Sequence, residues 1–347
     1  MEINIIPDQL VKSCNGLTAS QGGLNLVDFR KNLVSRLPKK YKNLNSYGRE
    51  ELQKLCEIYD IKYFDTKLNL STFNVLANTW IHLEYYPKSS YKFLEKDIRL
   101  RKTLRTLRSL GKTNDVIALQ ETEMDLLPLF NKELKKLGFE LFHSNHDDNY
   151  WDKYIIPGYP FVSNGVTLAW KKDKLSVINI DQYNLSDDGN RCIIGLFKLA
   201  NEKLIRIACV HLDGDTHGKR IEETKSLIAN MPLIDNVIDI IIGDLNYNYN
   251  ISPENNIFFQ NNFHSILKYV GKDEPTHPFS NEYKDNDNLG IIDHILIRNT
   301  NYTITVDGHV INYQLFSIVA SEEERANLLL DINGSDHFPV TATITIK

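Results

Sequence analysis

The sequence is poor in cysteine, and its cysteines form no recognisable metal or redox motif. Cys14, Cys56, Cys192 and Cys209 show no Cys-x-x-Cys or histidine-rich spacing, which argues against the common zinc-binding and thiol redox motifs. Cys192 and Cys209 lie inside apolar, strand-like runs, where cysteine acts as a small hydrophobic residue. We therefore expect reduced thiols in an intracellular protein, cytoplasmic rather than secreted, with the nucleus as the alternative.

Long apolar runs and an excess of positive charge are also missing. No stretch approaches the length needed to span a bilayer, and the first twenty residues carry Glu2, Asp8 and Lys12 without a continuous apolar core. Secretion and membrane contact are therefore not expected. The formal net charge of −5 provides no overall field for a polyanion, so any contact with nucleic acid would need local basic patches.

Residues 1–66 differ in pattern from the rest of the chain. Gly22-Gly23 interrupts short amphipathic pieces, and residues 51–59 have apolar positions at helical spacing. We expect a small helical extension over 1–66, followed by one catalytic domain over 67–347. A likeness of residues 52–61 to the first helix of a SAP motif lacks the second helix, so we favour packing or binding of a protein partner for the extension.

From residue 68 onward, short runs rich in branched residues alternate with helical patterns. The expected strands are 70–76, 116–119, 166–170, 193–199, 205–210, 238–242, 291–297 and 340–346. The expected helices are 93–110, 224–238 and a further helix through 137–139. Strands interleaved with helices predict an α/β protein in which helices cover sheets.

Polar side chains stand at the ends of several of these apolar runs. They are Asn74, Glu121, Asp244 with Asn246, Asp293, and Asp336 with His337. Taken singly, Glu121 reads as a solvated glutamate, and Asp244 with Asn246 as an ordinary turn. Taken together, they offer the carboxylate and amide oxygens that a hard divalent cation prefers. Such a cation can neutralise phosphate charge and activate water, which are the requirements for hydrolysing a phosphodiester.

In chain order, these motifs resemble the endonuclease/exonuclease/phosphatase family of metal-dependent phosphodiesterases over residues 68–347. The resemblance implies a four-layer α/β/β/α sandwich of two packed mixed sheets, with the active site at the sheet ends. It implies Mg²⁺, with Mn²⁺ as the alternative, bound by Glu121, Asn74 and Asp336. It also implies one-step hydrolysis by a water that the metal activates.

The same resemblance assigns roles to the remaining residues. Asp244 would orient or deprotonate the attacking water, and Asn246 and Asn74 would hold the phosphate. His337 would contact phosphate as a protonated imidazole whose other nitrogen is held by Asp293, although a lone histidine near a chain end is more often structural.

Two further residues complete the implied phosphate pocket. His211 matches the histidine of the family's Thr-His-Leu motif, although Val210 replaces the threonine and Cys209 a frequent asparagine. Arg191 matches an arginine that some members use against phosphate. It reads equally well as a surface arginine at a strand end.

Within the family, the motif order from Asn74 to Trp170 is most similar to the branch of poly(A) deadenylases, nocturnin and angel proteins. This implies a 3′-to-5′ exoribonuclease acting on single-stranded RNA. The sequence departs from that branch at three places. It has Gly334 in place of proline, Asp293-His294 in place of Asp-Tyr, and Asp213 after His211-Leu212. They leave room for a repair enzyme like tyrosyl-DNA phosphodiesterases or abasic-site endonucleases.

Two more functional classes are less favoured by the sequence. A lipid or inositol phosphatase would suit a membrane-associated chain, and nothing in the sequence indicates one. A catalytically idle scaffold that binds partners would be expected to have lost principal residues, and all of them are present.

A basic helix and a set of aromatic residues offer contacts for nucleic acid. The predicted helix 93–110 has a leucine stripe and a cationic face, which a solvated surface explains more simply than RNA binding. Trp80, Tyr85 and Tyr86 are candidates for stacking on unpaired bases or for a place in the core.

Overall fold

The computed structural model describes residues 2–3, 66–146, 162–187, 189–247, 254–272, 274–277, 290–298, 302–312 and 321–346. The expected helical extension over residues 1–66 lies outside these ranges except for its first strand and its last residue. It therefore stays a prediction, as does the division of the chain at residue 66.

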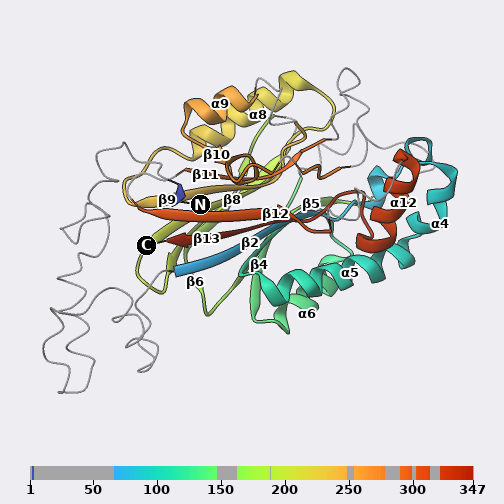
Figure 1. Cartoon of the computed structure of the whole chain (residues 1–347), viewed down its shortest axis with the longest axis horizontal. Helices are drawn as coiled ribbons and strands as arrows, with labels where there is room; N and C mark the ends of the chain where they lie inside the picture. The colour runs from blue at the N-terminus through green and yellow to red at the C-terminus, as the bar shows by residue number, and fades with distance from the viewer. Residues whose placement is uncertain are drawn as a thin grey trace, which may run out of the picture.

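Two mixed β-sheets form the centre of the molecule (Figure 1). The first sheet has seven strands in the order β1-β12-β13-β2-β3-β5-β4. These are β1 (Glu2–Ile3), β12 (Ile304–Val310), β13 (Val340–Ile346), β2 (Thr66–Asn74), β3 (Val116–Glu123), β5 (Asn164–Lys171) and β4 (Phe139–Asn145). The second has six strands in the order β10-β11-β9-β8-β7-β6. These are β10 (His264–Ser265), β11 (Asp293–Arg298), β9 (Val237–Asp244), β8 (Leu204–His211), β7 (Arg191–Leu199) and β6 (Leu175–Asn184).

Helices cover the outer face of each sheet (Figure 1). Buried residues of α5 (Lys96–Thr113) and α6 (Leu127–Lys135) pack on the first sheet, and those of α8 (His217–Asn230) and α9 (Glu254–Gln260) pack on the second. The other helices within the described residues are α4 (Tyr91–Leu94), α10 (Ile266–Tyr269), α12 (Glu322–Asn333) and the 3-10 turns η2 (Asn78–Trp80), η3 (Leu83–Tyr85) and η4 (Lys88–Ser90). The expected four-layer α/β/β/α sandwich is confirmed.

The largest core lies between the two sheets and explains the apolar runs of the sequence. Along β9, Ile238, Ile240 and Ile242 face the other sheet, whereas Ile241 faces the helices. A strand covered on both faces is apolar at most positions, which is why β9 shows a nearly continuous apolar run instead of an alternating one. The exception inside the run is Asp239, a buried carboxylate that pairs with Arg206 and Arg298. In the described residues, no helix is both long enough and apolar enough to cross a membrane.

Every strand expected from the sequence is present, but two helix predictions are wrong in position. The helix expected over 224–238 is α8, which begins at His217 and ends at Asn230, and residues 237–238 already belong to β9. Pro232 lacks the N–H that helix continuation requires. The helix expected through 137–139 is α6, which ends at Lys135, and β4 begins at Phe139.

Candidate active site

Three strands of the six-stranded sheet place polar side chains side by side. In the ladder, Asp244 at the end of β9 pairs with His211 at the end of β8 and with Asp293 at the start of β11. Parallel strands end at the same sheet edge, and an antiparallel neighbour starts there. Gly243 allows a close approach in this row, because a Cβ atom there would lie 1.9 Å from the carbonyl oxygen of Val210.

The seven-stranded sheet contributes Asn74 and Glu121 at its facing edge. Asn74 ends β2 and pairs with Gln120 of the parallel strand β3. The strand expected over 116–119 is longer than predicted, because β3 continues to Glu123 through a break in its pairing with β5 between Leu119 and Thr122. Glu121 lies in this irregularity with a φ of 59°, which is uncommon outside glycine. An irregular strand of this kind re-aims a side chain, here toward the second sheet.

Asn74 joins the two sheets. Its amide nitrogen donates to Glu121 Oε1 at 2.8 Å and to Asp244 Oδ2 at 3.0 Å, although these residues are far apart in sequence. Its amide oxygen accepts from the backbone N–H of Leu76 at 2.9 Å, which fixes the orientation of the amide. Asn74 therefore holds the two carboxylates through its NH₂ group, and its oxygen is already engaged.

His337 and Asp293 lie in direct contact, as the sequence predicts. His337 Nδ1 is 2.8 Å from Asp293 Oδ2, and both side chains are buried. Burial lowers the pKa of His337, but the carboxylates of Asp293, Asp244 and Asp336 overcome it and raise that pKa well above its usual value. His337 Nε2 lies 3.7 Å from Asp244 Oδ2 and 3.9 Å from Asp336 Oδ1, so a protonated Nε2 faces the space between those carboxylates.

Asp336 has two partners that the sequence reasoning missed. The hydroxyl of Tyr86 donates to Asp336 Oδ2 at 2.7 Å, and His277 Nε2 is 3.6 Å from the same oxygen. Burial raises the pKa of Asp336, but His277, His337 and Tyr86 together hold it well below its usual range. Tyr86 was expected to stack on a base or to lie in the core, and it is buried against Asp336, whereas Tyr85 is exposed.

His211 and Asn246 lie on the solvent side of the cluster. His211 Nε2 is 3.8 Å from Asp244 Oδ2 and 3.9 Å from Glu121 Oε1, and the side-chain nitrogen of Asn246 is 3.1 Å from the same His211 atom. Asn246 has a φ of 50°, so the chain is not extended from Asp244 to Asn246. The two residues form a turn in which the Asn246 N–H donates to Asp244 Oδ1 at 2.9 Å.

Arg191 lies at the start of β7, at the margin of the cluster. Its Nε donates to Asn184 Oδ1 at 3.1 Å and its Nη1 to the carbonyl oxygen of Asn145 at 3.4 Å. The neighbouring His146 is buried, and its ring centroid is 6.3 Å from that of His211. Burial, with the charges of His211, His143 and Arg191, lowers the pKa of His146 to about 3.

The electrostatic environment shifts the pKa values of Asp244 and Glu121 in opposite directions. Burial raises the pKa of Asp244, but the charges of His337 and His211 and the hydrogen bond from Asn74 reverse this and lower it. Burial raises the pKa of Glu121 and outweighs the charge of His211 and the hydrogen bond from Asn74, which both lower it. A nearby cation would stabilise the ionised form of Glu121, which burial disfavours.

A divalent cation fits this edge of the molecule. Asp336 Oδ1 is buried and has no hydrogen-bond partner within the part of the chain that the structure describes. Each oxygen of Glu121 accepts one hydrogen bond, from Asn74 or from the N–H of Ala77, and keeps a further lone pair. Glu121 and Asp336 thus offer hard oxygen ligands, whereas Asn74 in this orientation positions carboxylates.

The structure explains the three positions, Gly334, His294 and Asp213, at which the sequence departs from the deadenylase, nocturnin and angel branch. Gly334 follows α12 with a φ of 73°, which proline cannot adopt. His294 stacks on Tyr247 in the core, and burial lowers its pKa to about 4. Asp213 accepts hydrogen bonds from the N–H groups of residues 215 and 216 just before α8. These three residues shape the fold around the cluster.

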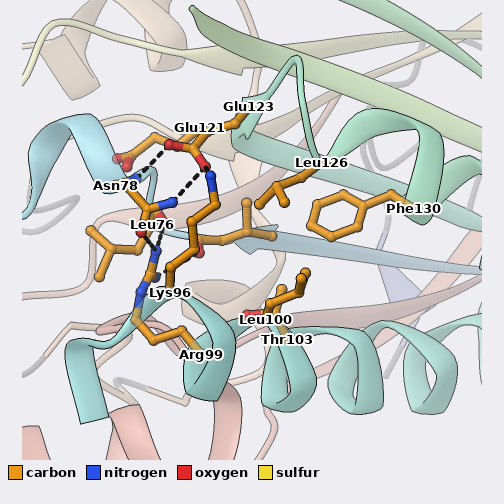
Figure 2. Close-up of a pocket in the computed structure, with 11 residues that line it drawn as sticks. Leu76, Asn78, Lys96, Arg99, Leu100, Thr103, Glu121, Glu123, Leu126 and Phe130 are labelled. Atoms are coloured by element: carbon orange, nitrogen blue, oxygen red, sulfur yellow. Dashed lines mark hydrogen bonds and ion pairs between the residues drawn. The ribbon is translucent and has the colours of Figure 1, made fainter. Parts of the chain in front are cut away.

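A small cavity lies behind Glu121 and is shown in Figure 2. It encloses about 10 Å³, room for about one water molecule and not for a substrate. The buried guanidinium of Arg99 on α5 lies at this cavity and donates to the carbonyl oxygens of Leu76 at 2.7 Å and Gly334 at 3.0 Å. It also donates to Asn78 Oδ1 at 3.1 Å. Arg99 thus ties together the segments that follow Asn74 and precede Asp336.

We expect Arg99→Lys to lower the free energy of unfolding by about 3 kcal/mol, because one ammonium group cannot serve these separate acceptors and leaves buried carbonyls unpaired. Denaturant titration measures the change. Arg101→Lys on the exposed side of the same helix is the control, and it should stay within about 0.5 kcal/mol. Equal losses in both variants would contradict the role of Arg99.

Three of the basic residues on α5 are neutralised by neighbouring acids. Lys96 pairs with Asp125, Lys102 with Asp331, and Arg108 with Glu133. This agrees with the simpler interpretation of the basic helix as a surface feature.

Comparisons with known proteins identify the family and the fold. The model of the endonuclease/exonuclease/phosphatase family matches residues 71–337. No curated protein matches the sequence. Among solved structures, the human Nocturnin catalytic domain with bound sulfate anion is 14% identical, with a TM-score of 0.57, over 81% of this chain and 94% of that one.

Two further solved structures share the fold. ANGEL2, a 2′,3′-cyclic phosphatase, is 12% identical, with a TM-score of 0.56, over 81% of this chain and 95% of that one. A mannosyl-6-phosphatase of Bacteroides thetaiotaomicron is 15% identical, with a TM-score of 0.50, over 80% of this chain and 99% of that one. Identities at this level establish the fold and not the substrate.

Proposed function

Because this chain belongs to the endonuclease/exonuclease/phosphatase family, whose members hydrolyse phosphoesters, we propose that it is a Mg²⁺-dependent phosphodiesterase, with Mn²⁺ as the alternative cation. More narrowly, we propose a 3′-to-5′ exoribonuclease that acts on single-stranded RNA in the cytoplasm. The observation that carries the proposal is the buried cluster in which Asn74 joins Glu121 to Asp244 while Asp293 holds His337.

The residues of the cluster divide the work of hydrolysis. When bound by Glu121 and Asp336, the cation would neutralise phosphate charge and make water more acidic. Asp244 is kept ionised by its neighbours, so it can orient the attacking water and accept its proton. The imidazolium of His337 directs Nε2 toward the reacting phosphate, where it would stabilise charge that develops in the transition state. His211, Asn246 and Arg191 would contact the phosphate from the more exposed side.

Two observations support RNA as the substrate: the similarity to one branch of the family and the exposed side chain of Tyr85. The motif order from Asn74 to Trp170 resembles the deadenylase, nocturnin and angel branch, and Nocturnin and ANGEL2 share the fold. Tyr85 is 62% exposed next to Tyr86, which contacts Asp336, so Tyr85 can stack on an unpaired base near the site. Since His294 and Asp213 have structural roles, they give no support to the repair-enzyme alternative.

A second candidate substrate is RNA that ends in a 2′,3′-cyclic phosphate. It is favoured by the similarity to ANGEL2, a 2′,3′-cyclic phosphatase whose TM-score of 0.56 is close to that of Nocturnin. The same cluster could open the ring, because a water attacking phosphorus needs the same charge stabilisation in both reactions. The leaving group is an oxygen of the same ribose when the ring opens and the 3′ oxygen of the preceding ribose when a nucleotide is released.

We expect end-labelled single-stranded RNA with a free 3′ hydroxyl to be shortened stepwise in Mg²⁺, with poly(A) as the favoured sequence. Stacking on bases tolerates many sequences and requires unpaired nucleotides, so duplex RNA should be a poorer substrate. Denaturing gels with 3′-blocked RNA, abasic duplex DNA, 5′-phosphotyrosyl DNA and RNA ending in a cyclic phosphate provide the comparison.

Each arm of that panel has a distinct meaning. Indifference to the 3′ block, or faster cleavage of either DNA, would replace the exoribonuclease proposal with the repair-enzyme alternative. Selective opening of the cyclic phosphate without shortening would favour the second candidate.

A further inference from the structure

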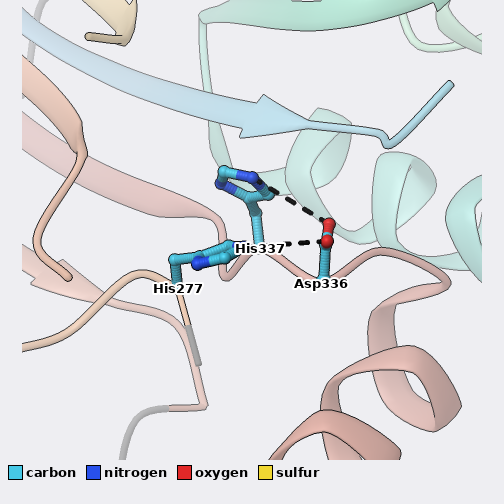
Figure 3. A group of neighbouring side chains, drawn as sticks. All are labelled: His277, Asp336 and His337. Carbon is cyan, nitrogen blue, oxygen red and sulfur yellow. Dashed lines mark ion pairs between the residues drawn. The ribbon is translucent and has the colours of Figure 1, made fainter. Parts of the chain in front are cut away.

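Two histidines and one aspartate meet at one side of the cluster, as Figure 3 shows. His277 Nε2 is 3.6 Å from Asp336 Oδ2, and His337 Nε2 is 3.9 Å from Asp336 Oδ1. The ring centroids of the histidines are 4.7 Å apart. One nitrogen or oxygen atom from each of the three side chains lies within 4.8 Å of the other two.

The backbone fixes the relative position of these side chains. The N–H of Thr276 donates to the carbonyl oxygen of Gly290 at 3.0 Å, and the N–H of Phe338 donates to the carbonyl oxygen of Thr276 at 2.8 Å. His277 and His337 therefore stand on adjacent, directly bonded segments, although they are far apart in sequence. A group of ligands held in this way loses little conformational entropy when it binds an ion.

Hydrogen bonds from neighbouring residues engage one atom of His337 and one atom of Asp336 and leave the other atom of each side chain available to a metal. Asp293 holds Nδ1 of His337, which leaves Nε2 as the ligand atom and forms the carboxylate–histidine arrangement common behind metal sites. Tyr86 donates to Oδ2 of Asp336, while Oδ1 is buried in a residue that is 6% exposed and lacks a hydrogen-bond partner among the described residues. A buried carboxylate oxygen without a hydrogen bond is costly, and a metal bound to Oδ1 would offset that cost.

We propose that His277, Asp336 and His337 form a Zn²⁺ site. Zinc bonds of about 2.0 Å in tetrahedral geometry place neighbouring ligand atoms about 3.3 Å apart, and one ligand atom from each of the three side chains lies within 4.8 Å of the other two, so binding requires the side chains to move closer together. Two imidazoles and one carboxylate suit Zn²⁺, whereas Mg²⁺ prefers oxygen ligands. The ligand set therefore differs in chemistry from the oxygen-rich edge at Glu121, although Asp336 belongs to both.

Zinc bound here would inhibit hydrolysis. His337 Nε2 cannot ligate a metal and present a proton to phosphate at the same time. Added Zn²⁺ should therefore suppress activity in the presence of excess Mg²⁺. This consequence rests on the proposed function, whereas the binding of zinc does not.

Binding is measured on the full chain after removal of metals with a chelator. Titration of Zn²⁺ against a chromophoric chelator should give one tight equivalent, and Co²⁺ should give the visible absorption of a four-coordinate site. We expect His277→Ala to weaken zinc binding by about 100-fold or more and Tyr86→Phe by about tenfold. His309→Ala, an exposed histidine on β12, is the control and should bind zinc like the parent protein.

Equal zinc affinity in the parent protein and in a folded His277→Ala variant would overturn the site, as would displacement of zinc by a similar concentration of Mg²⁺. If His277→Ala does not fold, Tyr86→Phe decides the question, because loss of one hydroxyl group removes only the outer contact to Asp336. If no phosphoester substrate is hydrolysed at all, the proposed function fails while the binding measurement still tests the zinc site. Inhibition that persists unchanged in His277→Ala would overturn the inhibitory role.

Discussion

Replacing Asp244 by asparagine is expected to lower kcat by about 10²-fold or more while KM changes little. The change keeps the size of a side chain that is 1% exposed and removes the charge that can take a proton from the attacking water. Steady-state kinetics on the best substrate of the panel measures both constants. Asp181→Asn on the exposed edge strand β6 is the control and should retain the parent kcat.

His337→Ala should produce the same kinetic pattern, because its imidazolium acts on charge that develops only in the transition state. Since His337 Nε2 lies 3.7 Å from Asp244 Oδ2, the two groups act on one reacting centre. We therefore expect the double variant to lose much less than the product of the two single losses. A rise in KM with unchanged kcat in both single variants would show that they serve substrate binding instead.

Glu121→Gln is expected to reduce activity by about 10²-fold or more at limiting Mg²⁺, with partial recovery at high Mg²⁺. A neutral amide is a weaker ligand for a hard cation than a carboxylate. Glutamine also cannot accept hydrogen bonds from Asn74 and from the N–H of Ala77 on both of its terminal atoms. The rate as a function of Mg²⁺ concentration, together with Mn²⁺ binding followed by electron paramagnetic resonance, measures the effect.

Glu123→Gln provides a matched control on the same strand. Glu123 accepts hydrogen bonds from the N–H and the amide of Asn78 at the small cavity, away from His211 and Asp244. Its substitution should leave the Mg²⁺ dependence close to that of the parent protein, although stability falls. An unchanged Mg²⁺ dependence in Glu121→Gln would refute the assignment of the cation to this edge.

The central strands could be predicted from the sequence, and the marginal ones could not. The expected strands are all interior to a sheet, whereas the missed strands include the edge strands β4 and β6. Most of β6 is exposed, so it lacks the apolar run by which a covered strand is recognised. Strands β7, β8 and β9 are buried along most or all of their length and show that run clearly.

The sequence also predicted that the polar residues at the strand ends lie close together. Asp244 and His211 follow apolar runs, and parallel strands bring such residues to one edge, so their proximity could be expected before the register was known. The orientation of each side chain was less predictable. Glu121 lies in an irregular part of β3 and Asn246 has a left-handed backbone, and neither feature has a reliable signal in apolar periodicity.

Partners drawn from distant segments could not be foreseen. Tyr86 contacts Asp336 across 250 positions, and His277 lies beside His337 although its sequence context resembles an ordinary loop. Arg99 looked like one of several cations on a basic helix, yet it is buried and holds backbone carbonyls on both sides of the cluster. Its neighbours Lys102 and Arg108 pair with acids from other helices.

The layered α/β fold and the residue types available for chemistry follow from the order of apolar runs along the chain, because burial on both faces of a strand imposes a local pattern. Which of those polar groups meet depends on the packing of the two sheets. Asn74 bonds to Asp244 from the opposite sheet, and Tyr86 and His277 converge on Asp336, through contacts that depend on how two sheets and a loop are packed. Such contacts follow from long-range packing, which local periodicity does not encode.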